Sequence, residues 1–135
     1  MTIRYLLDTN ICIDIAKHNP PAVRERFSQH SAAALAMSTI TMCELRFGAE
    51  KTQSPEKAWL ALQHLQSLIQ VAPLTDSVAT HYGEIRATLE RSGQIIGDND
   101  LWIAAHSRAE GWTLVTNNEH EFNRVDGLVV ENWAR

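Results

Sequence analysis

The chain lacks the residue patterns that build zinc and redox sites. It has two cysteines, Cys12 and Cys43, and neither belongs to a Cys-x-x-Cys motif or to a Cys/His pattern with ligand spacing. Its six histidines are scattered along the chain without such spacing. These absences argue against a zinc or redox motif, and we expect both cysteines to pack as small, buried, apolar side chains.

Long apolar runs are missing as well. No window approaches the roughly 20 apolar residues that cross a membrane, and the apolar run near the N-terminus is too short for a signal peptide. We therefore expect a cytoplasmic protein without membrane segments. Repeats, low-complexity segments and linkers are also absent, so we expect residues 1–135 to form a single domain with one core.

The chain has no excess of positive charge. Its 12 Lys and Arg are outnumbered by 16 Asp and Glu, which gives a net charge of −4. No basic field of the whole molecule therefore indicates nucleic-acid binding. A nucleic-acid enzyme is still compatible with this balance, because carboxylates that surround divalent cations lower the formal charge while the cations reverse it locally.

Short apolar runs alternate with helical patterns along the chain. Five such runs predict strands, at residues 3–7, 32–37, 71–74, 112–116 and 128–130. Pro73 places the third strand at an edge or an end of the sheet. The intervening patterns predict helices, apart from a loop or single turn at residues 117–122. This order favours an α/β three-layer sandwich, in which a mostly parallel central sheet carries helices on both faces.

Polar residues follow the predicted strands at the places where such a fold binds its ligands. In parallel α/β sheets the functional crevice lies beyond the carboxyl ends of the strands. Asp8 follows the first predicted strand, Ser38 and Thr39 follow the second, and Thr116 ends the fourth. This placement favours a functional role for Asp8 over a purely structural one.

Two further carboxylates lie on helix faces that the pattern assigns to the core. Glu44 comes four positions after Ile40 and three before Phe47, so it shares their apolar face. Asp100 points to the same side of its helix as Ile103. A carboxylate in such a place is costly unless something compensates its charge.

Each acid taken alone also has a structural explanation. Asp8 could cap the helix that follows it, and Glu44 could form an ion pair with Arg46 or Arg86. Taken together, three acids that converge from three elements on one crevice favour a metal site. Hard oxygen ligands without His or Cys suit Mg²⁺ or Mn²⁺ rather than zinc, and such metals activate water in phosphodiester hydrolysis.

Four stretches occur in the order and spacing of a known family. They read LLDTNI at residues 6–11, TITMCELRFGAEK at 39–51, IGDNDLWIAAH at 96–106 and LVTNN at 114–118. Together they resemble the VapC-type toxins of the PIN-domain ribonuclease family, which belong to bacterial toxin–antitoxin pairs, and the likeness covers nearly the whole chain.

The resemblance implies a PIN-like fold and a metal-dependent endoribonuclease that uses Mg²⁺ or Mn²⁺ and inhibits translation. The implied substrate is RNA, and the Asp-Thr-Asn-Ile-Cys opening resembles toxins that cut initiator tRNA in the anticodon region. The implied partners are a VapB-type antitoxin and a second copy of the chain in a homodimer. The antitoxin would lie near the predicted helix that carries Trp59, Leu62 and Leu65.

The resemblance also assigns roles to the acids. Asp8, Glu44 and Asp100 match the catalytic acids, with Asp8 and Asp100 holding the metal and Glu44 acting as a further ligand or as a base that orients water. The hydroxyls of Thr9 and Thr116 could support these ligands, although each could equally cap a helix.

Two acidic positions depart from the family's pattern. Asn118 occupies the place of a frequent fourth acid, so a second metal position depends on whether Glu119 or Glu121 replaces it. Asp98 is an additional acid. We expect it to cap the helix that carries Asp100, or at most to hold a water or a basic residue beside the site.

Other classes of protein share part of the pattern. Haloacid-dehalogenase-like phosphatases also use an aspartate after the first strand as nucleophile, which Asp8 and Asp98 would match, but Asn10 replaces their second acid. A receiver-like binding domain needs a lysine after its last strands, and none follows Lys57. A catalytically inactive PIN-like binding module is the remaining alternative.

Overall fold

The computed structural model describes residues 2–134, which form one five-stranded sheet and the helices around it. The strands are β1 (Tyr5–Leu7), β2 (Leu35–Ser38), β3 (Gln70–Ala72), β4 (Thr113–Val115) and β5 (Val129–Glu131). The α-helices are α1 (Thr9–Lys17), α2 (Pro21–Ser28), α3 (Thr39–Glu50), α4 (Pro55–Leu68), α5 (Ser77–Arg91), α6 (Asp98–Glu110) and α7 (Glu119–Phe122).

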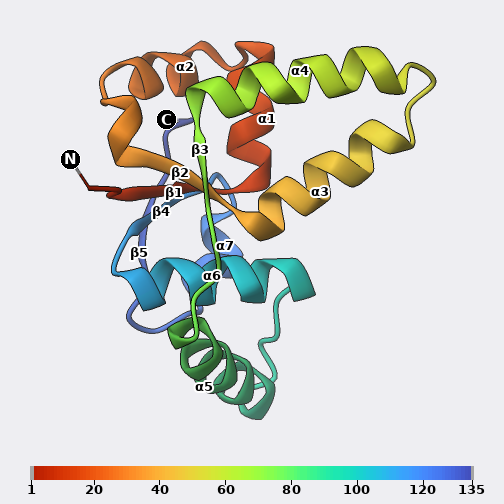
Figure 1. Cartoon of the computed structure of the whole chain (residues 1–135). Coiled ribbons are helices and arrows are strands. Elements are labelled where there is room, and N and C mark those ends of the chain that lie inside the picture. Colours follow the sequence, from red (N-terminus) through yellow and green to blue (C-terminus); the bar gives the residue numbers. More distant parts are fainter. Residues whose placement is uncertain (1, 135) are drawn as a thin grey trace.

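The predicted three-layer sandwich is confirmed, and the sheet is parallel throughout. Its strands run in the order β3-β2-β1-β4-β5, and every neighbouring pair is parallel. Helices α1, α2 and α4 cover one face, whereas α5 and α6 cover the other (Figure 1). Pro73 follows β3, which lies at one edge of the sheet as its proline predicts.

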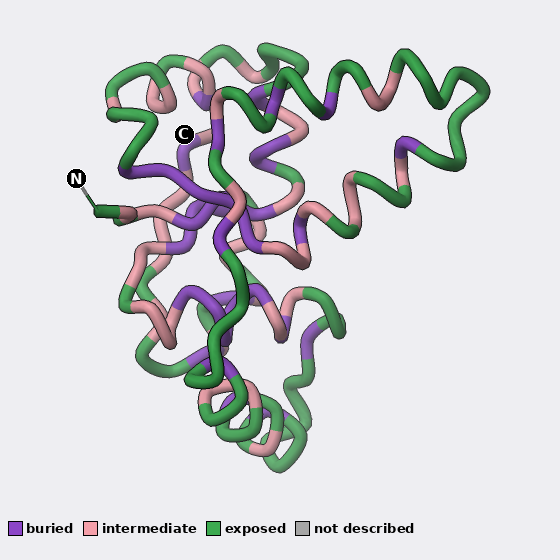
Figure 2. Tube along the Cα trace, in the orientation of Figure 1, coloured by how far each residue is buried: buried purple, intermediate pink, exposed green. Residues whose placement is uncertain are grey.

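Alternate strand residues supply two separate cores. Leu6 of β1 and Leu114 of β4 pack with α5 and α6, whereas Leu7 and Val115, one position further on, pack with α1 and α4. All four side chains are fully buried. Strands β1, β2 and β4 therefore run through the buried centre, whereas the edge strands β3 and β5, helix α5 and the far ends of α3 and α4 are more exposed (Figure 2).

The strand order predicts a binding crevice beside β1. From β1 the chain builds outward through β2 and β3, and it then crosses to the other side of β1 to add β4 and β5. Parallel sheets bind ligands where the strand order reverses in this way, beyond the carboxyl ends of the strands. Asp8 after β1 and Thr116 after β4 flank this position.

The second strand is shorter than its apolar run predicts. The alanines at its start form a 3₁₀ turn (Ala32–Ala34), and β2 begins only at Leu35. The Ser31 hydroxyl accepts a hydrogen bond from the Ala33 N–H, which caps this turn. Within residues 2–134, no helix is long and apolar enough to cross a membrane.

The two-sided core leads to a stability prediction. Replacing the fully buried Leu114 by alanine is expected to cost about 2–5 kcal/mol in the free energy of unfolding, because it leaves a cavity between β4 and the helices on its face. Replacing Leu60, which is 66% exposed, should change it by less than about 0.5 kcal/mol. Urea unfolding of both variants measures the difference, and similar losses would contradict the described core.

Candidate active site

Asp8 both caps a helix and faces the crevice. Its Oδ1 accepts a hydrogen bond of 2.9 Å from the Ile11 N–H at the start of α1, and the residue is only 5% exposed. Burial raises the pKa of Asp8 to about 6, although hydrogen bonds from Thr116 and Ile11 oppose this shift. The negative charges of Asp14 and Glu44 raise it further. Asp8 therefore caps α1 and, at the same time, lies among the other acids of the candidate site.

Thr116 supports Asp8 from the neighbouring strand end. Thr116 is fully buried, and its side chain hydrogen-bonds the Asp8 carboxylate. Its Oγ1 also accepts a hydrogen bond of 3.0 Å from the Asn118 N–H. A hydroxyl has one proton to donate and lone pairs to accept, so both contacts are satisfied at once. The predicted supporting contact of Thr116 with a site carboxylate is therefore present.

Glu44 reaches the crevice from α3 and is held by a hydroxyl of α1. Thr9 Oγ1 donates a hydrogen bond of 2.6 Å to Glu44 Oε1. The alternative of an ion pair with Arg46 or Arg86 is wrong, because each of these arginines pairs at 3.0 Å with the glutamate four positions further along its own helix. Glu44 is thus fixed by a neutral donor, and within residues 2–134 it forms no ion pair.

Asp100 lies in the first turn of α6 and faces three other carboxylates. Burial raises its pKa well above the ordinary range, and a hydrogen bond with the Glu121 side chain raises it further. The charges of Glu121, Asp8 and Glu44 act in the same direction. A hydrogen bond between two carboxyl groups requires a proton on one of them. The structure therefore brings all three predicted acids together and adds Glu121 to them.

Glu121, rather than Glu119, is the acid that contacts Asp100 and Asn118. It lies on α7, and its Oε2 accepts a hydrogen bond of 3.0 Å from Asn118 Nδ2. Glu119 instead accepts a hydrogen bond from Asn132 Nδ2. The sequence pattern alone favours neither of these two acids. The three-residue spacing of Asn118 and Glu121, which places them on one side of a helical turn, is the signal that separates them.

Asp98 does not have the predicted capping role. Helix α6 begins at Asp98 itself, and the residue at the cap position is Gly97, which makes no side-chain cap. Asp98 is exposed. Its carboxylate therefore interacts with the helix dipole, which favours negative charge in the first turn, rather than with specific backbone N–H groups.

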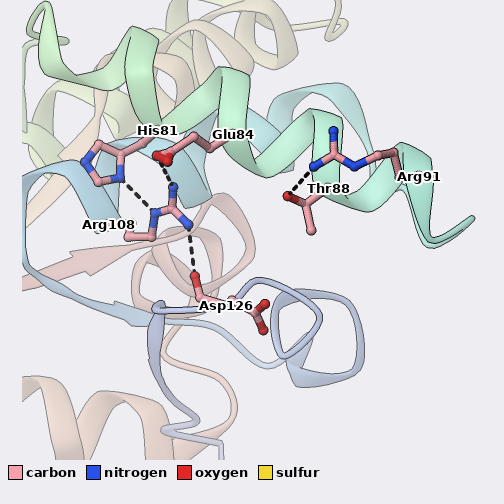
Figure 3. A network of polar contacts seen from close by, with 6 residues as sticks. All are labelled: His81, Glu84, Thr88, Arg91, Arg108 and Asp126. Atoms are coloured by element: carbon pink, nitrogen blue, oxygen red, sulfur yellow. Dashed lines mark hydrogen bonds and ion pairs between the residues drawn. The ribbon is translucent and has the colours of Figure 1, made fainter.

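The far end of α6 is anchored by a network around Arg108 (Figure 3). Its Nε donates to His81 Nδ1 at 2.8 Å, and its second terminal nitrogen donates to Glu84 at 3.2 Å, both on α5. The remaining terminal nitrogen donates to the backbone carbonyl of Asp126 at 3.0 Å. Helix α6 is thereby tied to α5 and to the segment that follows α7, so the elements that carry Asp100 and Glu121 are fixed to each other.

The chemistry of this donor set suits a hard divalent cation. The charges that act most strongly on Asp8 and Asp100 all come from carboxylates. Such clustered negative charge is relieved either by protonation or by a cation with oxygen ligands, such as Mg²⁺ or Mn²⁺. In the described chain, no three His, Cys, Asp or Glu side chains already lie at the distances of a ligand set.

An apolar groove of about 920 Å³ adjoins the acidic crevice. It is bounded by α1, α3 and α4, and Thr9 and Glu44 lie in its wall. The face of α3 that was expected in the core lines this groove instead, because α3 and α4 extend together away from the sheet (Figure 1). Phe47 is therefore 66% exposed, and Cys43 is exposed rather than buried as predicted.

Comparison with known proteins identifies the family. The PIN domain family matches residues 5–128. The chain is 43% identical over 132 residues to the tRNA(fMet)-specific endonuclease VapC of Shigella flexneri, covering 98% of this chain and 99% of that protein. It is 42% identical, at the same coverage, to Ribonuclease VapC2 of Haemophilus influenzae.

Solved structures agree with this result. The VapBC complex of Salmonella typhimurium bound to DNA has a chain that is 38% identical, with a TM-score of 0.91 and coverage of 98% of this chain and 99% of that one. VapBC2 of Rickettsia felis, bound to a DNA fragment from its promoter, has a chain that is 36% identical, with a TM-score of 0.90 and coverage of 97% and 99%. The chain belongs to the VapC-type ribonucleases of the PIN-domain family.

The raised pKa values predict how the metal-free protein responds to pH. The folded-state pKa of Asp8 lies above its ordinary value, so ionisation of Asp8 destabilises the folded state. In EDTA, Asp8→Asn is therefore expected to be more stable than wild type above about pH 6. This advantage should shrink as the pH falls from about 6 and should vanish below the ordinary pKa of 3.8, where Asp8 is protonated in both the folded and the unfolded protein. Melting temperatures from pH 4 to 8 measure it, and an Asp8→Asn protein that is less stable than wild type at pH 8 would contradict the buried-charge assignment.

Proposed function

We propose that the acidic crevice hydrolyses phosphodiester bonds of RNA with the help of Mg²⁺ or Mn²⁺. The observation that carries this proposal is the convergence of Asp8, Glu44, Asp100 and Glu121 at the switch point of the sheet. Burial and the neighbouring carboxylates raise the pKa of Asp8 and of Asp100, and Glu44 is held by the neutral hydroxyl of Thr9. Membership of the VapC-type ribonucleases supports RNA as the substrate.

Asp8 and Asp100 would hold the metal, and Glu121 would complete the acidic set where Asn118 brings no charge. When bound, the cation neutralises the negative charge that develops on the phosphate and lowers the pKa of water. Thr116 keeps the Asp8 carboxylate oriented, and Asn118 does the same for Glu121 through its hydrogen bond of 3.0 Å. Because these donors are neutral, they orient the carboxylates without adding a positive charge that would compete with the cation.

Glu44 is the best-placed proton acceptor of the set. One of its oxygens accepts the Thr9 hydroxyl at 2.6 Å, which holds the carboxylate in place. Its other oxygen remains to accept a proton from a water that attacks the phosphodiester. In this assignment Thr9 is a positioning residue, and Glu44 is the catalytic base.

The most specific substrate that we propose is transfer RNA, with initiator tRNA cut in the anticodon region. The Shigella flexneri relative is named a tRNA(fMet)-specific endonuclease, and it matches nearly the whole chain. Cleavage of that RNA would inhibit translation, which is the action of a toxin. The charge of the chain is consistent with this substrate only if cations offset the acids locally, since the net charge is −4.

The groove between α1, α3 and α4 is the proposed binding site of a VapB-type antitoxin. Similar structures are complexes of VapB with VapC. Leu62 of α4 and Phe47 of α3 line the groove, as an apolar partner helix requires. Because Glu44 lies in the same wall, a partner in the groove would cover the catalytic base. A homodimer of toxins, each carrying an antitoxin, is the proposed assembly.

Substitution of the acids tests the metal-dependent nuclease. With purified protein, Mn²⁺ and total tRNA, Asp8→Asn and Asp100→Ala are each expected to lower the cleavage rate by at least about 100-fold. Asp98→Ala should remain within a few-fold of wild type, because Asp98 is exposed. EDTA should abolish cleavage by wild type. Full activity of Asp8→Asn, or cleavage in excess EDTA, would refute the proposed mechanism, and mapped cut sites identify the RNA target.

Two equally exposed apolar residues test the groove. Phe47→Asp should abolish binding of the co-expressed antitoxin while leaving tRNA cleavage in place, because Phe47 is 66% exposed in the groove. Leu60→Asp is the matched control, since Leu60 is also 66% exposed but lies outside the groove. Co-purification and titration calorimetry measure the binding. Loss of binding in Leu60→Asp alone would place the antitoxin elsewhere.

A further inference from the structure

We propose that His106 is a positioning residue of the acidic crevice: its bond to Ser38 fixes the start of α3, and with it Glu44, against α6, which carries Asp100. The inference rests on the proposed metal-dependent function. It concerns a residue that makes no contact with the reacting groups and that the mechanism above does not use.

His106 is fully buried and joins two elements that carry site acids. It lies on α6, and its Nδ1 is 2.9 Å from the hydroxyl of Ser38, the residue that ends β2 and caps α3. Ser38 Oγ already accepts a hydrogen bond of 3.1 Å from the Ile40 N–H. The one hydroxyl proton of Ser38 is free to go to His106 Nδ1, and the Pro73 backbone near the ring favours the tautomer with its proton on Nε2, so we assign Nδ1 as the acceptor.

The second ring nitrogen, Nε2, indicates that packing alone does not explain a histidine at this position. Nε2 is buried and, among the residues that the structure describes, has no hydrogen-bond partner of normal geometry. Burial lowers the pKa of His106, although Glu110 and the backbone of Pro73 oppose this. A buried N–H whose contact with the Pro73 backbone is poorly aligned is unfavourable, and an apolar side chain would fill the same space without it. The well-formed hydrogen bond of the ring is the one with Ser38.

The bond lies at equal distances along the chain from the two acids. Glu44 comes six residues after Ser38, and Asp100 comes six residues before His106. On a helix six residues span about 9 Å. If the start of α3 tilts at Ser38, Glu44 is therefore displaced, because it lies about 9 Å along the helix from the point of the tilt. Such a tilt would also lengthen the bond of 2.6 Å between Glu44 and Thr9.

The start of α3 is held from two sides. Thr39 Oγ1 donates a hydrogen bond of 3.0 Å to the carbonyl of Ala72 in β3, which fixes the start of α3 to the sheet. His106 provides the connection to α6. Because the charge of Glu44 acts on both Asp8 and Asp100, a displaced Glu44 would weaken the attraction for a cation whether or not it is a ligand.

Mn²⁺ binding separates positioning from simple stabilisation. His106→Leu removes the acceptor, and His106→Asn can return an acceptor oxygen at the Nδ1 position. Ser38→Ala removes the donor together with the cap of α3, so the two His106 variants isolate the bond between the helices. The matched control is Ser107→Ala, which removes a partly buried hydrogen bond of 2.9 Å from the same helix to the Trp112 carbonyl, a bond that does not connect α6 to α3. Electron paramagnetic resonance of free Mn²⁺ measures affinity, and melting temperatures and tRNA cleavage are measured in parallel.

We expect His106→Leu and Ser38→Ala to bind Mn²⁺ about tenfold more weakly and to cleave tRNA more slowly. His106→Asn should recover most of the affinity, and Ser107→Ala should lose stability while binding Mn²⁺ as wild type does. Wild-type affinity in Ser38→Ala, or in a folded His106→Leu, would overturn the inference, and so would equal loss in Ser107→Ala. If His106→Leu does not fold, Ser38→Ala and His106→Asn decide alone. Wild-type protein that binds no Mn²⁺ would overturn the metal site itself, and the inference with it.

Discussion

The fold holds like charges together against their mutual repulsion. Asp8 and Asp100 are both drawn into a partly dehydrated crevice, where burial and neighbouring carboxylates raise their pKa values. Isolated side chains would not remain so close, so the surrounding elements must supply the constraint. The N-terminus of α1 and the hydroxyl of Thr116 offset part of the cost at Asp8, since both donate hydrogen bonds to its carboxylate.

The parallel sheet supplies most of that constraint. Because β1 lies between β2 and β4, the elements that leave its neighbours converge at one edge: α3 follows β2, and α7 follows β4. Helix α6 reaches the same edge with its N-terminal end, which favours negative charge. Four acids distant in sequence thus meet at a single crevice, and strong repulsion there makes a divalent cation the natural complement of the site.

The strand-end rule was sufficient to predict Asp8 and Thr116, because a buried parallel strand directs the residues at its carboxyl end to one edge of the sheet. The faces of α3 could not be predicted in the same way. Ile40, Glu44 and Phe47 share a side of the helix, but periodicity cannot distinguish a core from the wall of a groove. The cap of α6 was missed for a local reason: Gly97, which has no side chain to donate or accept, occupies the position expected for Asp98.

Asn118 stands where related proteins often have an acid, and the negative charge is supplied by Glu121 instead. An aspartate at position 118 would repel Glu121, whereas the Asn118 amide donates a hydrogen bond to it. That bond fixes one oxygen of Glu121 and leaves its carboxylate able to contact Asp100. The acid is thus supplied from one helical turn further along the chain, and the neutral residue at 118 orients it. A single missing carboxylate in the sequence pattern therefore does not imply a less acidic crevice, because the three-dimensional neighbours of that position determine its charge.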